Sequence, residues 1–440
     1  MNKEIFKNIP IDRKFFLKIL KDDPNNYDAV LKLGLFDIKE NNLLSAKKNF
    51  EKLIKLNKLR FEGYLNLSNI FFLESNHTNA NNILKNYLEN IEENLEIIHA
   101  LCINLLNSKN YEELDGHIKK YINHHKSHIL NYLKGYLLIR ENKISDSEKY
   151  LKKSIDLSDS FWQSYELLLK QYEKQSRLDD FGKLIKSANN IFKENHMLSY
   201  YESLYLYRIG KYKKSLRILQ NDYVLNNLKK NNNKIPLADF YDLLSKVFEK
   251  LKFFSESYEL AIKRNQVTLN LSENKKYTKE LVLDTIKIYQ NFFDKENKTL
   301  TKSKFEGLYH SNLVFLIGFP RSGTTLLDTI LRSHSSTLVL EEKPYLLDVR
   351  HKFYKNHILP DILLIDDQKK IKLQEEYFNS FNYQKNKTVV DKYPLNLIEL
   401  GFIKTLFPKS KIILAIRHPL DCIISCVLTA FKMNDGMVNF

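Results

Sequence analysis

A glycine-containing loop holds the residues of this chain that are best suited to chemistry. Gly318-Phe-Pro-Arg-Ser-Gly-Thr-Thr325 has the spacing of a nucleotide-binding GxxxxGK[ST] loop, but Thr324 stands where the lysine belongs. Glycines in such a loop let backbone N–H groups turn toward an anion, and the helix that follows adds its positive end. The lysine normally reaches the terminal phosphates of a nucleoside triphosphate, and here Arg321 is the only cation inside the loop. The loop predicts a site for a phosphate-like group.

The flanking sequence supplies the elements that such a loop needs. Leu313–Ile317 is an apolar run typical of a buried strand, and the segment from Thr324 to His334 has apolar residues at helical spacing. An ordinary strand-to-helix turn with two glycines would fit the bare spacing. The added Pro-Arg-Ser and Thr-Thr favour a binding loop.

Further polar groups follow other predicted strands, at the edge where open α/β sheets bind their ligands. These groups are Glu341-Glu342 after Thr337–Leu340, Asp391-Lys392-Tyr393-Pro394 after Thr388–Val390, and Arg417-His418-Pro419-Leu420-Asp421 after Lys411–Ile416. Each group also has a structural alternative: a helix N-terminal acidic pair for the glutamates, a solvated loop lysine for Lys392, and an ion pair with Asp421 for Arg417.

The first 260 residues contain a repeat with a period of about 34 residues. Small or apolar residues recur as anchors, and further small or apolar residues follow each anchor after 12 and 16 positions, as two close-packed helices per unit require. The anchors are Gly34, Ser68, Cys102, Gly135, Leu169, Ser203 and Ser245, and the longer last gap fits an insertion near Asn226–Lys234. The period resembles that of the tetratricopeptide repeat, in which helix pairs bury their faces by stacking on neighbours.

Taken together, the loop, Glu341-Glu342, Asp391-Lys392 and Arg417 followed by Ser425 resemble the sulfotransferase superfamily in order and spacing. Both halves of the chain resemble bacterial tetratricopeptide-sulfotransferase fusions, whose enzymatic half is akin to the protein-tyrosine sulfotransferases. The family transfers a sulfuryl group from 3'-phosphoadenosine-5'-phosphosulfate to a hydroxyl or amine acceptor without a metal.

The resemblance also implies a role for each site residue. Glu342 matches the family's general base, and Lys392 and Arg321 are candidates for stabilising charge on the leaving phosphate. Arg417 and Ser425 would hold the 3'-phosphate of the donor. The 5'-phosphosulfate would lie on the loop residues Pro320, Arg321, Ser322, Gly323, Thr324 and Thr325. Independently of the resemblance, crowding of Glu341 against Glu342 would raise the pKa of one carboxyl group, unless the adjacent side chains diverge.

The expected fold is multidomain: an all-α tetratricopeptide solenoid precedes an α/β domain with a parallel, P-loop-like sheet. The predicted boundaries are 1–265 for a solenoid of about seven helix pairs, 266–304 for a linker with an amphipathic helix, and 305–440 for the N-terminal part of a sulfotransferase domain. The family's domain continues beyond the position of Phe440, so we expect an incomplete domain.

Composition narrows the class of protein. The net charge of +16 comes from lysines scattered along 440 residues rather than from one basic patch, so it does not predict nucleic-acid binding. The three cysteines have no metal-type pairing, and the N-terminus has no uninterrupted apolar stretch. These features predict a cytoplasmic protein without a membrane span. The repeats predict a concave surface that holds a peptide or protein partner, with scaffolding or dimerisation as the alternative.

Two other functions fit the same residues. A P-loop kinase or NTPase would need Lys392 or Arg417 in place of the missing lysine and Asp391 on magnesium. A non-catalytic repeat scaffold would carry only a degenerate nucleotide-binding remnant. The acceptor is not readable from the sequence.

Overall fold

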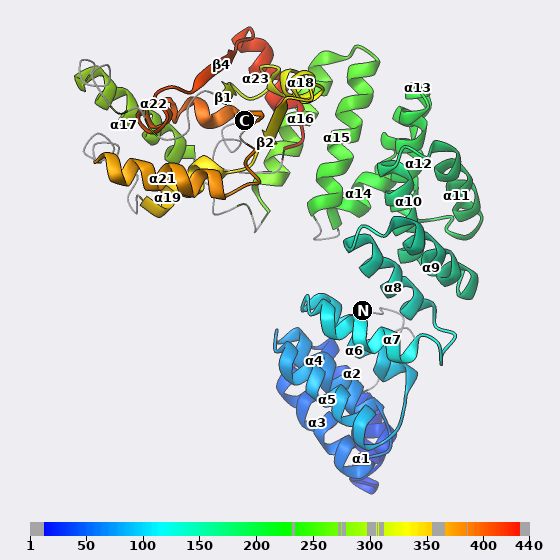
Figure 1. The fold of residues 1–440 in the computed structure, drawn as a ribbon. Helices are drawn as coiled ribbons and strands as arrows, with labels where there is room; N and C mark the ends of the chain where they lie inside the picture. Colours follow the sequence, from blue (N-terminus) through cyan, green and yellow to red (C-terminus); the bar gives the residue numbers. More distant parts are fainter. Residues whose placement is uncertain are drawn as a thin grey trace. The chain divides into compact units, whose positions relative to one another are not determined.

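The structure is a computed structural model that describes residues 13–230, 234–271, 274, 279–296, 305, 307, 312–353, 366–384 and 386–431. Contacts divide the chain into two compact units, Met1–Tyr205 and Leu206–Phe440. Figure 1 shows the ribbon with its helix and strand labels. Each unit is described by itself.

The first unit consists of helices that pair along the chain. After α1 (Arg13–Asp22), helix α2 packs on α3, α4 on α5, α6 on α7, α8 on α9 and α10 on α11, and the second helix of each of the first four pairs also packs on the first helix of the next. Their bounds are α2 (Tyr27–Lys39), α3 (Leu43–Leu56), α4 (Glu62–Leu73), α5 (His77–Asn90), α6 (Leu95–Asn107), α7 (Tyr111–Tyr121), α8 (His128–Arg140), α9 (Ile144–Leu157), α10 (Trp162–Lys174) and α11 (Leu178–Ile191).

Every predicted anchor of the repeat is buried. The small side chains let paired helices approach closely, and serine hydroxyls bond across the contact: Ser68 Oγ donates to the carbonyl of Ala80 at 2.9 Å, and Ser147 Oγ donates to that of Gly135 at 2.8 Å. Neither hydroxyl is left unsatisfied in the core. The predicted helical solenoid is confirmed.

The turn between paired helices repeats a backbone conformation. Seven positions after each anchor, one residue has a positive φ, the left-handed conformation that often ends a helix. These residues are Asn41, Ser75, Lys109, Asn142, Ser176, Gly210 and Lys252.

The second unit begins within α12 (His196–Arg208) and continues with further helices. They are α13 (Tyr212–Leu219), α14 (Asp222–Lys230), α15 (Lys234–Lys250), α16 (Phe254–Leu269) and α17 (Lys279–Glu296). Helices α15 and α16 form a pair of the repeat type, and α14 falls in the longer last gap of the period. Residues 231–233 of the predicted insertion lie outside the described residues.

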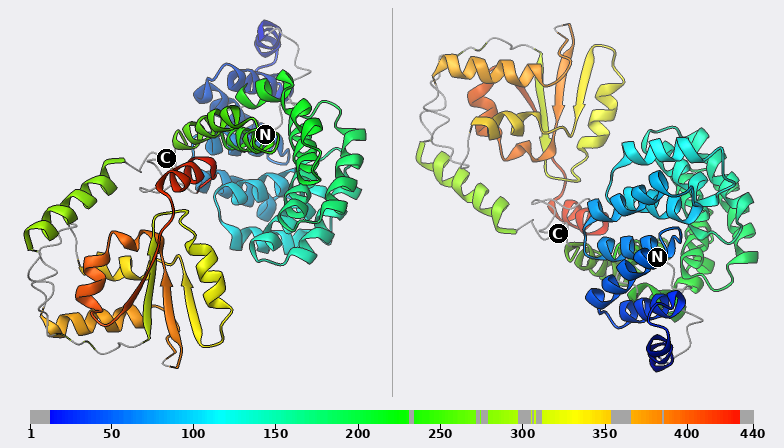
Figure 2. Two further views of the ribbon diagram at one scale, coloured as in Figure 1. Left: turned by 90° about the horizontal axis from the view of Figure 1, so that it is seen from above. Right: turned by 90° about the horizontal axis from the view of Figure 1, so that it is seen from below.

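The rest of the second unit is built on a four-stranded sheet in the order β2-β3-β1-β4, and all three strand pairs are parallel (Figure 2). The strands are β1 (Leu313–Gly318), β2 (Thr337–Glu341), β3 (Thr388–Lys392) and β4 (Lys411–Ala415). The helices are α18 (Thr324–Arg332), α19 (Tyr345–Phe353), α21 (Asp367–Asn379), the 3₁₀ helix η4 (Pro394–Leu397), α22 (Leu400–Leu406) and α23 (Pro419–Leu428). The predicted α/β fold with a parallel sheet is confirmed.

Alternate residues of the central strand supply two cores. Phe315 and Ile317 of β1 pack with α21 and α22, whereas Val314 and Leu316 pack with Leu327 of α18 on the opposite face. This alternation is what a strand covered on both faces requires. Since all four strands are parallel, their carboxyl ends meet at one edge of the sheet.

The predicted linker contains a helix that packs on this core. Tyr289 of α17 is buried, and its hydroxyl donates to Glu399 Oε2 at 2.9 Å. The last helix pair also joins this unit, because α16 contacts α23. The boundaries 1–265, 266–304 and 305–440 stay a prediction. In the part of the chain that the structure describes, no helix has the length and apolar character needed to cross a bilayer.

Candidate active site

The phosphate loop joins β1 to α18 with a backbone that only certain residues tolerate. Gly323 has a φ of +99° and stands at the N-cap of α18, where no side chain caps the helix. Arg321 has a φ of +69°, a left-handed conformation that is costly for an arginine. A Cβ on Gly318 would lie 2.7 Å from the carbonyl oxygen of Ala415, so β1 must end in glycine beside β4.

A cavity of about 530 Å³ opens at this loop. Seven of the ten predicted site residues line it: Pro320, Arg321, Gly323, Thr324, Thr325, Glu342 and Arg417. The other lining residues, which the sequence did not single out for a role, are Tyr393, Pro394, Leu395 and Phe431. Three predicted site residues do not line the cavity, although each lies beside a residue that does: Ser322, Lys392 and Ser425.

Arg321 links the phosphate loop to Arg417, which follows β4, and to Ser425 of α23. Its Nε donates to Ser425 Oγ at 3.0 Å, and Arg417 Nη1 donates to the carbonyl oxygen of Arg321 at 3.2 Å. Arg417 Nε also lies 3.7 Å from Asp421 Oδ2, so the ion pair given above as the structural alternative for Arg417 is present. The structure therefore brings Arg321, Arg417 and Ser425 together, with Arg321 between the other two.

Ser322 carries a hydroxyl group without a partner. It is 8% exposed, and its Oγ makes no hydrogen bond among the described residues. A buried hydroxyl usually finds a partner, and a ligand in the adjoining loop would supply one.

Lys392 is the centre of a charge cluster that adjoins the cavity through Glu342. Its Nζ lies 2.7 Å from Glu342 Oε1 and 3.0 Å from Asp328 Oδ2, and both Lys392 and Asp328 are fully buried. Burial alone would lower the pKa of Lys392, but its hydrogen bonds to Glu342 and Asp328 outweigh burial and raise this pKa above its usual value. Lys392 is therefore a paired ammonium group, and the solvated-loop alternative is wrong.

The two neighbouring glutamates share Lys392 but differ in their closest partner, which is Arg332 for Glu341 and Lys392 for Glu342. Glu342 has a φ of +48°, donates its N–H to the carbonyl of Lys392 at 2.8 Å, and reaches the cavity with its side chain. Glu341 Oε2 accepts from Arg332 at 2.8 Å. The hydrogen bond from Arg332, with the charge of Lys392, lowers the pKa of Glu341. The expectation that crowding raises the pKa of a carboxyl is wrong for Glu341, because cations separate the pair.

Asp391 lies next to Lys392 in β3 but on the other face of the sheet. It is fully buried, and Tyr377 donates its hydroxyl to Asp391 Oδ2 at 2.6 Å while Oδ1 has no partner. Burial raises the pKa of Asp391 from 3.8 to about 7. Asp391 supports the core and does not reach the cavity.

Asp328 and Arg332 were missed by the sequence reading. Both belong to α18, where Asp328 lies among Leu327 and Leu331 on the side of the helix that faces the sheet. A carboxylate at a core position of an amphipathic helix is a signal that a buried cation lies opposite. The spacing of β3 gave no indication that Lys392 was this cation.

Comparison with known proteins identifies a family for the sheet-containing part of the second unit. The family model described as "Sulfotransferase family" matches residues 314–439, a range that begins in β1 and contains every predicted site residue. This part of the chain is a sulfotransferase-family domain. The predicted resemblance to a tetratricopeptide-sulfotransferase fusion is confirmed by this match and by the helix pairs that precede it.

Other similarities are more distant. An uncharacterized protein of Aquifex aeolicus (strain VF5) is 26% identical over 210 residues, which is 45% of this chain and only 27% of the relative's length. A tetratricopeptide repeat protein from Parabacteroides merdae has 12% identity and a TM-score of 0.42, covering 57% of this chain and 96% of that one. Pseudomonas aeruginosa pilF has 13% identity and a TM-score of 0.34, with 57% and 95% covered.

Proposed function

We propose that the sulfotransferase domain transfers a sulfuryl group from 3'-phosphoadenosine-5'-phosphosulfate to a hydroxyl or amine of an acceptor. The observation that carries this proposal is the cavity in which the phosphate loop, Arg417 and Glu342 meet, inside the family match. The loop offers anion binding, Arg417 offers a second cation, and Glu342 offers a base.

The donor would lie on the loop side of the cavity. The uncapped N-terminus of α18 presents backbone N–H groups and the positive end of the helix dipole to the 5'-phosphosulfate. The guanidinium group of Arg417 suits the 3'-phosphate through its planar fork, with Ser425 held nearby through Arg321.

Glu342 would act at the acceptor side. The oxygen of the acceptor attacks the sulfur, the bond from sulfur to the bridging phosphate oxygen breaks, and 3'-phosphoadenosine-5'-phosphate leaves. The acceptor proton passes to the carboxylate of Glu342, whose side chain is 55% exposed and lines the cavity. Arg321 and Lys392 would stabilise the charge that develops on the leaving phosphate.

The repeats would recruit the acceptor or a partner protein. Stacked helix pairs present an extended concave surface that commonly holds a peptide. We propose this role for the helix pairs, with neither nucleic acid nor membrane as partner.

One observation disfavours a kinase or NTPase. That function needs Asp391 as a magnesium ligand, but Asp391 is fully buried on the other face of the sheet and bonded to Tyr377. Lys392, the substitute for the missing loop lysine, is held by two carboxylates.

Binding of the product nucleotide tests the proposal directly. We expect 3'-phosphoadenosine-5'-phosphate to raise the melting temperature of the protein, and Arg321→Ala and Arg417→Ala to abolish the rise because each removes a cation of the site. Arg217→Ala is the matched control, since Arg217 is an exposed arginine of α13 in the same unit. A magnesium-dependent shift with ATP, and none with the bisphosphate, would refute the proposal.

Transfer from a labelled phosphosulfate donor to acceptors in a cell extract tests catalysis separately. Glu342→Gln should lose at least about 100-fold in transfer while it still binds the nucleotide, because only the base is removed. Partner binding by the repeats, together with no transfer by the unaltered protein, would indicate the non-catalytic scaffold instead.

A further inference from the structure

A buried arginine of the repeat-type helix α16 holds one end of helix α23. The side chain of Arg264 is 3% exposed. Its Nη2 donates to the carbonyl of Val427 at 2.5 Å and to that of Thr429 at 3.0 Å, and its Nη1 donates to that of Leu428 at 3.0 Å. Asn265 adds a bond from its Nδ2 to the carbonyl of Val427 at 3.3 Å.

These three carbonyls are the ones that a helix cannot satisfy by itself. Helix α23 ends at Leu428 with Thr429 as its C-cap, and the last carbonyls of a helix have no intrahelical donor. A cation at this end also complements the negative end of the helix dipole. Arg264 supplies both the donors and the charge.

Arg264 is itself fixed from the other side. Its Nη1 donates to Asp242 Oδ1 of α15 at 2.7 Å, and its Nε and Nη2 both contact Asn265 Oδ1. All three guanidinium nitrogens are therefore engaged. A lysine could not replace this fork, because it has one nitrogen and no planar geometry.

Helix α23 also reaches the proposed donor site. Ser425, one turn before its C-terminal end, accepts from Arg321, and Cys426 contacts the carbonyl of Pro320 through its sulfur at 3.8 Å. A shift of this helix would move the partner of Arg321 and the wall of the loop together.

We propose that Arg264 is a positioning residue for the sulfotransferase site: it clamps the C-terminal end of α23 and thereby holds Ser425 against Arg321. The effect on the donor nucleotide rests on the proposed function. The clamp on α23 does not.

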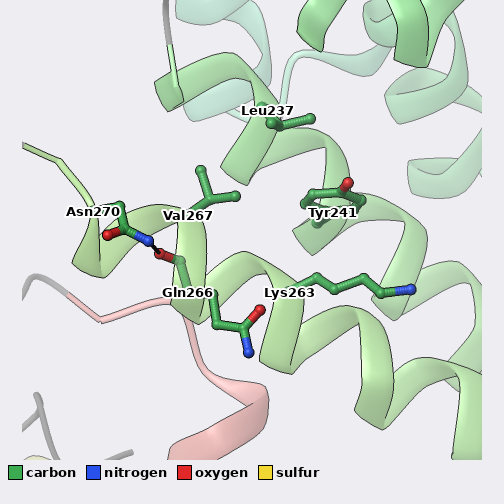
Figure 3. Close-up of a pocket in the computed structure, with 6 residues that line it drawn as sticks. All are labelled: Leu237, Tyr241, Lys263, Gln266, Val267 and Asn270. Atoms are coloured by element: carbon green, nitrogen blue, oxygen red, sulfur yellow. Dashed lines mark hydrogen bonds between the residues drawn. The ribbon is translucent and has the colours of Figure 1, made fainter.

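The neighbouring residue Lys263 provides a matched control. Lys263, Gln266 and Val267 of α16 line a cavity of about 340 Å³ with Leu237 and Tyr241 of α15. Figure 3 shows these side chains. Lys263 is exposed and carries the same charge as Arg264 one position earlier on the same helix. Lys263→Met thus removes a cation from α16 without touching the clamp.

The rate of thiol labelling measures how firmly Arg264 holds α23, and it needs no ligand. Cys422 and Cys426 are buried on α23, and Cys102 is buried in α6 of the other unit. We expect Arg264→Met to speed labelling of Cys422 and Cys426 roughly tenfold or more, relative to Cys102, because α23 opens locally more often. Lys263→Met should label like the unaltered protein, and Arg264→Lys should lie between.

Nucleotide affinity measures whether the position of α23 affects the donor site. Arg264→Met should weaken binding of 3'-phosphoadenosine-5'-phosphate roughly tenfold, with Lys263→Met unchanged. If Arg264→Met does not fold, Asp242→Asn replaces it, since this change frees Arg264 from α15 and should move both readouts in the same direction.

The outcomes separate the two proposals. Labelling of Cys422 and Cys426 that is unchanged in Arg264→Met overturns the clamp. Faster labelling with unchanged affinity overturns the positioning role. If the unaltered protein does not bind the bisphosphate, the proposed function fails, and the labelling rates alone decide whether Arg264 holds α23.

Discussion

The buried carboxyl group of Asp391 should make the sulfotransferase domain less stable as pH rises toward neutrality. In the folded protein burial raises its pKa from 3.8 to about 7. Between these values the folded protein keeps a proton that the unfolded chain has lost. Stability therefore falls as pH rises through this window, and it is constant, as far as this group is concerned, above and below it.

The size of the effect follows from the same shift. One pKa unit corresponds to about 1.4 kcal/mol, so the roughly three units between 3.8 and 7 correspond to about 4 kcal/mol. About 3 kcal/mol of this is expected between pH 5 and pH 8. Asp391→Asn keeps the acceptor for the Tyr377 hydroxyl but cannot ionise, so this variant should lack the dependence.

Hydrogen exchange of the backbone amides of β1 and β3, corrected for the intrinsic exchange rate at each pH, measures the opening free energy of this core. The difference between the unaltered protein and Asp391→Asn isolates the one carboxyl group, because all other titrating groups are shared. Asp284→Asn, an exposed aspartate of α17, is the control and should follow the unaltered protein. A difference that changes by less than about 1 kcal/mol from pH 5 to pH 8 would refute the reasoning.

Two substitutions test the packing around the site. Lys392→Met should destabilise the domain by about 3 kcal/mol, because it removes the buried one of the two cations that pair with the buried carboxylate of Asp328; Asp328→Asn in the same background should recover part of the loss in urea unfolding. Gly318→Ala should destabilise by about 2 kcal/mol, since its Cβ would lie 2.7 Å from the carbonyl of Ala415. Gly116→Ala, where a Cβ meets nothing within 4 Å in α7, should instead raise the melting temperature of its unit slightly.

The helical repeat was predictable because the buried small or apolar residues recur at a regular spacing in the sequence. Each anchor must be small or apolar for two helices to approach, so the sequence keeps the 34-residue register even where single units are degenerate. The left-handed turn residues follow the same register but were not predicted. Lys109 and Lys252 adopt this conformation as Asn41 and Gly210 do, so the turn is imposed by the paired helices and not by the residue type.

The site was predictable only as far as the strand order allowed. Polar residues that follow parallel strands must meet at one edge, and the cavity contains Arg321, Glu342 and Arg417 from three such positions. The sequence could not indicate which side chains pair beneath that edge. Asp328 lies on α18 just outside the loop motif, and Arg264 lies on α16, far from any motif. Only the packing of helices brings them to Lys392 and α23.

The charge cluster also separates the roles of the two cations proposed for the leaving group. Lys392 is fully buried against Asp328 and Glu342, and moving its ammonium group to a ligand would break both ion pairs and leave the buried Asp328 with Arg332 as its cation. Arg321 is exposed, lines the cavity, and has Ser425 as its side-chain hydrogen-bond partner. Arg321 can therefore turn to a leaving phosphate at little cost, while Lys392 is better placed to hold the side chain of Glu342 in position at the cavity wall.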